Sequence, residues 1–456
     1  MVLKRHNITS RLTVLLLAVT LIYSCSPVDL DFTAIPQPGR TEEETTVRVP
    51  VPDYRNVFIV YSMGFNSLSH DLQDDIRDIL NNPISDNSRD VILILSHYSK
   101  GSNYSIATTP TLTKVYSKLD GDIQKDTLMT MSESKIATTP EVLNEVLSYI
   151  FENFHAESYG LLMSSHGFGW LPPEYSTKSY TLETQYGKTD TDYDSGQPQK
   201  RALDSPIEYH RPEGPRTKGM GVHNYNSHDY TEINIADLAK SIPFKLDYII
   251  FDACFMGCIE VAYELRNIAN KIVASQTEIL ADGMDYPSMC RYIFANEGPD
   301  LKGLCQRYYE YYNLQSGWNK SATISLVDCS KLETLAQQTK SIINLHKDGL
   351  TNAQNNRNKI QRYFQYSHRS AHQWFYDFEE IIKYYEPSDE ELNAFKSSLM
   401  DAVIYKASTA YFVSHSELSI NHHSGLSMYL PYATGRDYLN DFYKTLEWNK
   451  VTGLVE

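Results

Sequence analysis

The sequence has no run of about 18 apolar residues beyond its first 25 positions, so we do not expect its body to span a membrane. It also lacks an excess of positive charge: 41 Lys and Arg residues stand against 57 Asp and Glu residues, a net charge of −16. Nucleic acids are bound through clustered Lys and Arg, so this balance argues against a nucleic acid partner. The 456 residues suffice for two or three domains, or for one large domain with an addition.

Several enzyme motifs are absent. There is no CxxC pair, and Cys254-x3-Cys258 has no second pair at the spacing of a zinc finger, so a structural zinc site is not expected. The chain has neither a Walker loop nor the G-x-S-x-G elbow of serine hydrolases. A metallohydrolase site is poorly supported, because an HExxH glutamate is missing. Such a site would be built on His223, His228, His422 and His423; the pair His223-x4-His228 lies in an irregular stretch, and solvated loop histidines are the preferred interpretation.

The N-terminus has the features of an export signal. Basic side chains precede an apolar stretch at residues 12–23, and Ser24 and Cys25 follow it. A basic flank, a short apolar segment and a small residue before the cleavage point are typical of a secretory signal. The motif that ends in Cys25 resembles the bacterial lipobox, whose cysteine is acylated. An ordinary signal peptide with a chance cysteine is the alternative.

These features predict how the mature chain is attached to a membrane. We expect a lipoprotein signal peptide at residues 1–24, a lipid anchor at Cys25 and a tether over residues 25–52. Ser26, in place of an acidic residue, favours the outer membrane by the usual bacterial sorting pattern. We therefore expect an exported monomer that is lipid-anchored to the outer membrane, with the periplasmic or surface face left open.

From about residue 56, apolar runs alternate with helical patterns. The apolar runs predict buried strands at residues 56–63, 91–96, 158–164, 246–252 and 271–274. Helical spacing predicts helices at residues 72–80, 139–154 and 259–266. Strands and helices that alternate in this way form a mostly parallel sheet with helices on both faces. The fold class is therefore α/β.

The pattern changes after about residue 300. Long helices are predicted at residues 301–314, 331–345 and 389–405, and strands near 322–327 and 426–430. Ser388 is the expected N-cap of the last of these helices. We predict an α/β core at residues 53–298, interrupted by a long irregular insertion at 171–230, and a C-terminal helical α+β subdomain at 299–456.

Two predicted strands end in residues that can carry chemistry. In sheets of this kind the site lies beyond the carboxyl ends of the strands. One strand is followed by His166-Gly167 and the other ends in Asp252-Ala253-Cys254. A thiolate is a nucleophile and a neighbouring imidazole can handle its proton. Either residue alone is more often a packing residue, but the pair favours catalysis. The N–H groups of Gly167 and Cys254 are candidates for an oxyanion hole, because glycine lets a substrate carbonyl approach the backbone.

Cysteine number supports an active thiol. Setting aside Cys25 leaves five cysteines, an odd number for an exported protein. At least one of them must be free, paired between chains or chemically active.

These motifs resemble those of the clostripain family of cysteine peptidases (clan CD), relatives of caspases, gingipains and legumain. The resemblance rests on His166-Gly167 and on residues 252–256. Further similar segments follow in the family's order at residues 60–68, 273–278, 281–286, 325–332 and 424–431. The resemblance spans about residues 54–435. It implies a caspase-like α/β/α sandwich and a cysteine endopeptidase with a Cys254–His166 dyad, whose partner is a peptide or protein substrate.

The resemblance also implies cleavage after Arg or Lys. It places Asp252 and Asp282 in an acidic S1 pocket, since a guanidinium in a partly dry pocket needs a carboxylate partner. The ordinary alternatives are backbone hydrogen bonding at a strand end for Asp252 and turn capping for Asp282. The family commonly has Trp-Asn before the histidine, where this chain has Ser164-Ser165. The basic preference is therefore less secure than the dyad.

The long insertion predicts activation by internal cleavage, with Lys200 or Arg201 as the cleavage point. Some family members need calcium, and three alternating aspartates in the insertion resemble the start of an EF-hand loop: Asp190, Asp192 and Asp194. The rest of the segment does not match an EF-hand loop, because Gly196 comes one position late and Arg201 stands where a glutamate belongs. We expect no cofactor, with calcium as an open alternative.

A second functional class stays open. A catalytically weak or inactive lipoprotein of the same fold would bind peptide or glycan at the cell surface, using some of the 34 tyrosines. His166 and Cys254 are both present, which favours the enzyme.

Overall fold

The computed structural model describes residues 52–173, 233–363, 374–432 and 437–456, apart from Pro83, Ser102 and residues 118–121. The predicted signal peptide, Cys25 and nearly all of the tether lie outside these residues, as does most of the insertion. Seven of the candidate residues also lie outside the described part of the chain: Lys200, Arg201, Asp190, Asp192, Asp194, His223 and His228.

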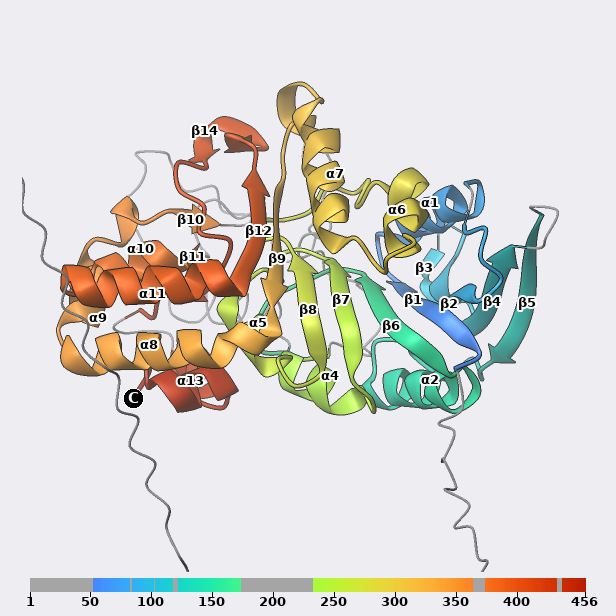
Figure 1. Ribbon diagram of the computed structural model, residues 1–456, viewed down its shortest axis with the longest axis horizontal. Coiled ribbons are helices and arrows are strands. Elements are labelled where there is room, and N and C mark those ends of the chain that lie inside the picture. Colours follow the sequence, from blue (N-terminus) through green and yellow to red (C-terminus); the bar gives the residue numbers. More distant parts are fainter. Residues whose placement is uncertain are drawn as a thin grey trace, which may run out of the picture. The chain divides into compact units, whose positions relative to one another are not determined.

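A single large sheet organises the described part of the chain. Its strands are β1 (Tyr54–Gly64), β2 (Asp90–Lys100), β3 (Asn103–Ala107), β4 (Thr111–Ser117), β5 (Ile123–Thr130), β6 (Ala156–Ser164), β7 (Leu246–Asp252), β8 (Ala269–Ala274), β9 (Thr323–Asp328) and β12 (Val403–Ser408). Their order is β12-β9-β8-β7-β6-β1-β2-β4-β5, with β3 paired to β2 (Figure 1). The five central strands from β8 to β2 run parallel, and the flanking strands pair antiparallel.

The five parallel strands are the five predicted from apolar runs. They are buried on both faces, and β7 shows why: six of the seven residues of its sequence LDYIIFD are buried. A strand covered on both sides must be apolar at successive positions, which is the pattern that made these segments recognisable. The predicted α/β fold is confirmed, with a sheet that is parallel through its five central strands and antiparallel at its flanks.

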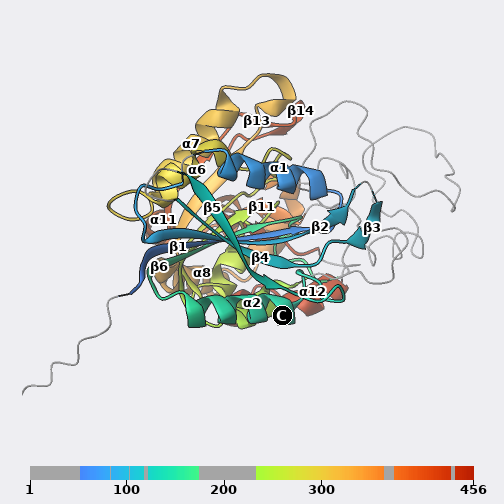
Figure 2. The ribbon, with the colours of Figure 1, turned by 90° about the vertical axis from the view of Figure 1, so that its right-hand side faces the viewer.

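Helices cover the sheet on both faces (Figure 2). One face carries α1 (Ser69–Leu80), α6 (Tyr286–Ile293) and α7 (Leu301–Asn313). The other face carries α2 (Pro140–Asn153), α4 (Ile235–Ser241), α5 (Ile259–Glu264) and α8 (Leu332–Leu345). Each layer has its own apolar core, so the architecture is an α/β/α sandwich.

The C-terminal region adds smaller elements. The helices are α9 (Gly349–Asn355), α10 (Phe378–Lys383), α11 (Asp389–Ala402), α12 (Asp437–Tyr443) and α13 (Glu447–Thr452), with short 3-10 turns at Gly317–Asn319, Cys329–Lys331 and Arg357–Lys359. The strands β10 (Arg362–Tyr363), β11 (Phe375–Asp377) and β15 (Ser427–Tyr429) form a three-stranded sheet, and β13 (Tyr411–Phe412) pairs with β14 (Ser414–Ser419).

Two details of this region differ from the prediction. The helix expected over residues 389–405 begins as predicted, with a capping box between Ser388 and Glu391, but it ends at Ala402. The chain then enters β12, because Val403 and Ile404 are β-branched and β9 offers an open edge. Strands β9 and β12 extend the central sheet, so the predicted addition is partly continuous with the core sheet. Within the described ranges, no helix is long and apolar enough to cross a membrane.

Candidate active site

The predicted base and nucleophile follow neighbouring parallel strands. Ser164, the last residue of β6, pairs with Asp252, the last residue of β7. Parallel strands in this register end at the same edge of the sheet. His166 and Cys254 each lie two residues beyond their strand, so the fold brings both to one edge.

The backbone of Gly167, which follows β6, packs directly against the backbone of Cys254, which follows β7. A Cβ atom on this residue would lie 2.4 Å from the carbonyl oxygen of Cys254 and 2.7 Å from its amide nitrogen. No side chain fits in this space, so only glycine allows the backbone after His166 to pack against the backbone of Cys254. From the sequence we expected glycine here for the approach of a substrate, whereas the structure requires glycine for the approach of the Cys254 backbone.

The segment that follows β8 holds Cys254. The Ile279 N–H donates to Cys254 Sγ at 3.0 Å, and the Ile279 carbonyl oxygen lies 3.8 Å from the sulfur. The Phe255 N–H donates to the Thr277 carbonyl at 3.0 Å. Phe255 has φ of 61°, a left-handed conformation that is costly for a bulky side chain. Cys254 is therefore held in a tight turn, with 0% of its surface exposed.

His166 is half-buried, and one of its ring nitrogens has a polar neighbour, Ser67. The Ser67 hydroxyl oxygen lies 3.2 Å from His166 Nε2. Ser67 belongs to the loop after β1, the third strand that ends at this edge. Sequence reasoning noticed this loop only as a family segment and gave Ser67 no role, because a single serine in a turn carries no signal of its own.

Asp252 is fully buried at the end of β7. Its Oδ2 accepts hydrogen bonds from the Ser164 hydroxyl at 2.7 Å and from the Tyr286 hydroxyl at 2.6 Å. Burial raises the pKa of Tyr286 well above its usual value, and the negative charge of Asp252 adds to the effect. Ser164, one of the two residues that depart from the family pattern, thus contacts the predicted pocket carboxylate directly.

Asp282 is exposed and lies in a turn beside α6. The Tyr312 hydroxyl donates to the carbonyl of Gly283 at 2.6 Å, which fixes this turn against α7. The pKa of Tyr312 is raised well above its usual value, first by burial and then by the charges of neighbouring groups that include Asp282 and Asp252. The two predicted S1 carboxylates therefore lie near the same tyrosine, one buried and one at the surface.

The family model for the clostripain family of peptidases matches residues 60–190 and 208–453, well over half of the chain. This chain belongs to the clostripain family. No curated protein matches the sequence.

Solved structures of clostripain-family members share the fold. An inactive zymogen C11 protease from Parabacteroides distasonis is 26% identical, with a TM-score of 0.65 over 89% of this chain and 99% of that one. A secreted C11 cysteine protease from Bacteroides thetaiotaomicron, "iotapain", is 24% identical, with a TM-score of 0.67 over 88% of this chain and 100% of that one. A secreted C11 protease from the same bacterium, in complex with an irreversible peptide inhibitor, is 21% identical, with a TM-score of 0.64 over 88% of this chain and 99% of that one.

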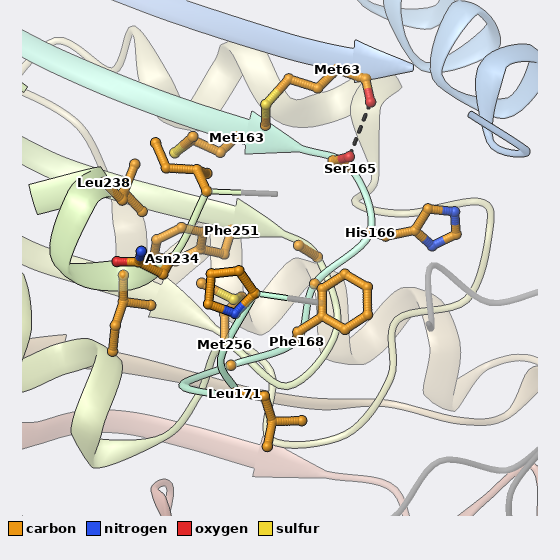
Figure 3. A pocket seen from close by; sticks show the side chains of 16 residues that line it. Met63, Met163, Ser165, His166, Phe168, Leu171, Asn234, Leu238, Phe251 and Met256 are labelled. Carbon is orange, nitrogen blue, oxygen red and sulfur yellow. Dashed lines mark hydrogen bonds between the residues drawn. The ribbon is translucent and has the colours of Figure 1, made fainter. Parts of the chain in front are cut away.

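A pocket lies beside His166 in this clostripain-family site (Figure 3). Its walls are mainly apolar side chains of the sheet face that carries α2 and α4, among them Met163, Phe251 and Met256. The imidazole of His166 points away from these three side chains in Figure 3. Neither Asp252 nor Asp282 lines this pocket, so it is distinct from the predicted acidic S1 pocket.

Two of the four histidines weighed as metal ligands lie in the described residues, and both have protein partners. His422 Nε2 lies 3.4 Å from Asp377 Oδ1 and 3.5 Å from Glu379 Oε2. The hydrogen bond with Glu379 raises the pKa of His422, while burial opposes it. His423 Nε2 lies 2.6 Å from Gln276 Oε1. Among the residues that the structure describes, no group of three or more His, Cys, Asp or Glu side chains is arranged to hold a metal ion.

Proposed function

We propose that the protein is a cysteine endopeptidase in which Cys254 is the nucleophile and His166 handles the proton, with cleavage after Arg or Lys. The observation that carries this proposal is the contact of Gly167 with the backbone of Cys254, since it joins the two residues at one edge of the sheet. Membership of the clostripain family supports the same chemistry.

The reaction is an acyl transfer in two halves. The Cys254 thiol proton passes to His166, and Sγ bonds to the carbonyl carbon of the substrate. The peptide C–N bond breaks as the imidazolium gives its proton to the leaving amine. Water then loses a proton to His166 and attacks the thioester, and the C–S bond breaks to restore the thiol.

The oxyanion of each tetrahedral intermediate needs backbone donors. We propose the N–H groups of Gly167 and Cys254 for this role, because their backbones lie against each other. Two N–H groups from adjoining loops converge on one oxygen only if those loops are fixed, and the close packing at Gly167 supplies that constraint.

The specificity proposal rests on Asp252 and Asp282. A substrate guanidinium or ammonium ion is stabilised by a carboxylate that is shielded from water, and Asp252 is fully buried. Asp282 is exposed and lies close enough to Tyr312 to act on it together with Asp252. We therefore assign Asp252 to the base of the S1 pocket and Asp282 to its rim.

A second candidate function is favoured by one observation: Cys254 has no exposed surface. A protein of this fold that never exposed its thiol would bind peptide or glycan without cleaving it. A latent enzyme explains the same burial, and a solved relative is described as an inactive zymogen.

Peptides that carry Arg, Lys, Asp or Ala before a fluorophore separate these functions. We expect hydrolysis after Arg or Lys by the wild type, and a loss of at least about 1,000-fold in Cys254→Ala. Activity that survives this substitution rejects the mechanism, and cleavage after Asp alone rejects the acidic pocket. Peptide binding without cleavage, unchanged by Cys254→Ala, favours the second function.

We further propose that cleavage at Lys200 or Arg201 activates the enzyme. Mass spectrometry of the purified wild type should show two fragments that meet in residues 171–230, and Cys254→Ala should stay intact. Identical intact chains in both samples reject self-cleavage.

Export and the lipid anchor at Cys25 also stay proposals, and one relative of the same fold is described as secreted. Mass spectrometry of the N-terminal peptide from bacterial membranes should show acylated Cys25. Recovery of an unprocessed N-terminus contradicts this.

A further inference from the structure

Ser67 is a polar residue that contacts the candidate base from the loop after a third strand, β1. Its hydroxyl oxygen lies 3.2 Å from Nε2 of His166, within hydrogen-bonding distance. Both side chains are half-buried, so the contact is partly shielded from water and is worth more than one at an open surface. Nothing in the dyad mechanism above uses Ser67.

The loop that carries Ser67 is held on both sides of this residue. Asn66 is buried; its Nδ2 donates to the Met63 carbonyl at 2.9 Å, and its Oδ1 accepts from the Leu68 N–H at 2.9 Å. The Ser69 N–H donates to the Asn66 carbonyl at 3.1 Å. Because these bonds fix the backbone before and after Ser67, its hydroxyl has a defined place.

Met63 and Asn66 also bind Ser165, the residue before His166. The Ser165 hydroxyl donates to the Met63 carbonyl at 3.0 Å, the bond drawn in Figure 3, and Asn66 Nδ2 donates to Ser165 Oγ at 3.3 Å. The loop after β1 and the loop after β6 are thus tied to one point. The two ends of the Ser67–His166 contact are therefore fixed relative to each other, which a chance surface contact would not be.

We propose that Ser67 is a positioning residue for His166, a role that rests on the proposed peptidase function. An imidazolium donates from both ring nitrogens, and the Ser67 oxygen accepts the proton on Nε2. This hydrogen bond orients the ring, stabilises its charged form and leaves Nδ1 to exchange the proton with Cys254 and the leaving amine. Ser67 touches neither substrate nor sulfur in this role and acts only through His166.

The test compares Ser67→Ala with Ser67→Thr, which keeps the hydroxyl. A hydrogen bond to a charged group is worth about 1.5–3 kcal/mol, so we expect kcat to fall about 10-fold or more in Ser67→Ala, with KM within about twofold. The limb of the pH–rate profile that reports His166 should move to lower pH. Ser67→Thr should restore both to near the wild-type values.

Ser69→Ala is the matched control, at the first residue of α1 and two positions after Ser67. Its hydroxyl accepts from the Ser99 N–H at 3.1 Å and from Gln73 Nε2 at 3.2 Å, so it supports structure without contacting His166. We expect Ser69→Ala to lower the melting temperature and to leave the pH–rate profile in place. If Ser67→Ala behaves like Ser69→Ala, Ser67 is only structural and the proposal is wrong.

A second measurement works without peptidase activity. NMR titration of histidines labelled with ¹³C, in the Cys254→Ala background and with His166→Gln for assignment, reports the protonation of His166 directly. We expect its midpoint to move to lower pH in Ser67→Ala and to return in Ser67→Thr; an unchanged midpoint overturns the proposal. Inactivity of the wild type on every peptide would count against the proposed function, and this titration would still decide the role of Ser67.

Discussion

Two buried carboxylates flank Cys254 in the chain and lie on opposite faces of the sheet. Asp252 precedes Cys254 by two residues and Glu260 follows it by six, and both have 0% of their surface exposed. Each accepts a tyrosine hydroxyl, Tyr286 on Asp252 at 2.6 Å and Tyr443 on Glu260 at 2.7 Å. Burial and a tyrosine partner are therefore common to both and do not by themselves mark a functional carboxylate.

Their positions differ. Asp252 ends a strand at the sheet edge that His166 and Cys254 follow, and its charge acts on Tyr312 together with that of the exposed Asp282. Glu260 lies within α5, and it accepts the Tyr429 N–H at 2.8 Å from the C-terminal strand β15. Burial raises the pKa of Glu260 to about 7, although its hydrogen bonds act in the opposite direction. The comparison teaches that proximity to the open strand ends, and not burial, separates a candidate binding carboxylate from one that stabilises packing.

Asp252→Asn should give the largest effect. Removing one partner of a buried charge pair costs about 2–5 kcal/mol, so kcat/KM for peptides with Arg should fall about 1,000-fold. Asp247→Asn, at the opposite end of β7, is the control and should stay within about threefold. Steady-state kinetics with Arg peptides checks this. Equal losses in both variants would mean that Asp252 supports the strand and not the pocket.

Glu260→Gln should act on stability and its pH dependence. The folded protein keeps the Glu260 proton up to about pH 7, whereas the unfolded chain loses it near 4.5. Stability is therefore lost as pH rises through this window, by on the order of 3 kcal/mol. Urea unfolding at pH 5 and pH 8 should show this loss in the wild type and in exposed Glu141→Gln, but not in Glu260→Gln. The same loss in all three proteins would contradict the prediction.

Asp282→Asn should reduce kcat/KM for Arg peptides by about fivefold at low salt, because an exposed carboxylate attracts the cation through water. The difference from the wild type should shrink in 0.5 M NaCl, a range where the screening length falls to roughly 4 Å. Glu297→Gln, another exposed carboxylate, should have no such effect. A loss that is independent of salt would place Asp282 in direct contact with the substrate.

The paired substitutions Tyr443→Phe and Tyr286→Phe should have the smallest effects and should separate the two carboxylates. Each removes one hydroxyl donor, worth about 1 kcal/mol. Tyr443→Phe should lower stability by that amount and leave the kinetics unchanged. Tyr286→Phe should also change KM for Arg peptides by about twofold to fivefold. Thermal unfolding and steady-state kinetics of both variants check this; identical kinetic behaviour would remove the distinction.

The sequence predicted the central sheet because its strands are apolar on both faces. The flanking strand β5 was missed, since its sequence IQKDTLMT is half exposed and has no buried run. Strand β12 was hidden inside a helical pattern that continues past Ala402, and only the open edge of β9 ends that helix. The local sequence pattern therefore located the central strands, whose own residues are apolar throughout. It missed β5 and β12, which are strands only because a neighbouring strand pairs with them.

The candidate site was likewise predictable only where the sequence around a residue was informative by itself. His166 and Cys254 could be placed, because strand order alone brings their strand ends together. Glu260 was missed, because its burial depends on Tyr429 and Tyr443, which lie 169 and 183 residues further along the chain. Ser67 was missed because its role depends on a contact with a loop 99 residues away.

The position of β1 in the sheet has a consequence for folding kinetics. This first strand lies between β2 and β6, and it pairs with β6 along most of its length although the two are about 100 residues apart. Contacts this distant in sequence slow folding, because loop entropy is lost before they form. The sheet therefore cannot close around β1 until β6 has been synthesised. Until then β1 can pair only with β2, so a chain that we propose is exported has one unpaired side on its first strand while its N-terminal part is being synthesised.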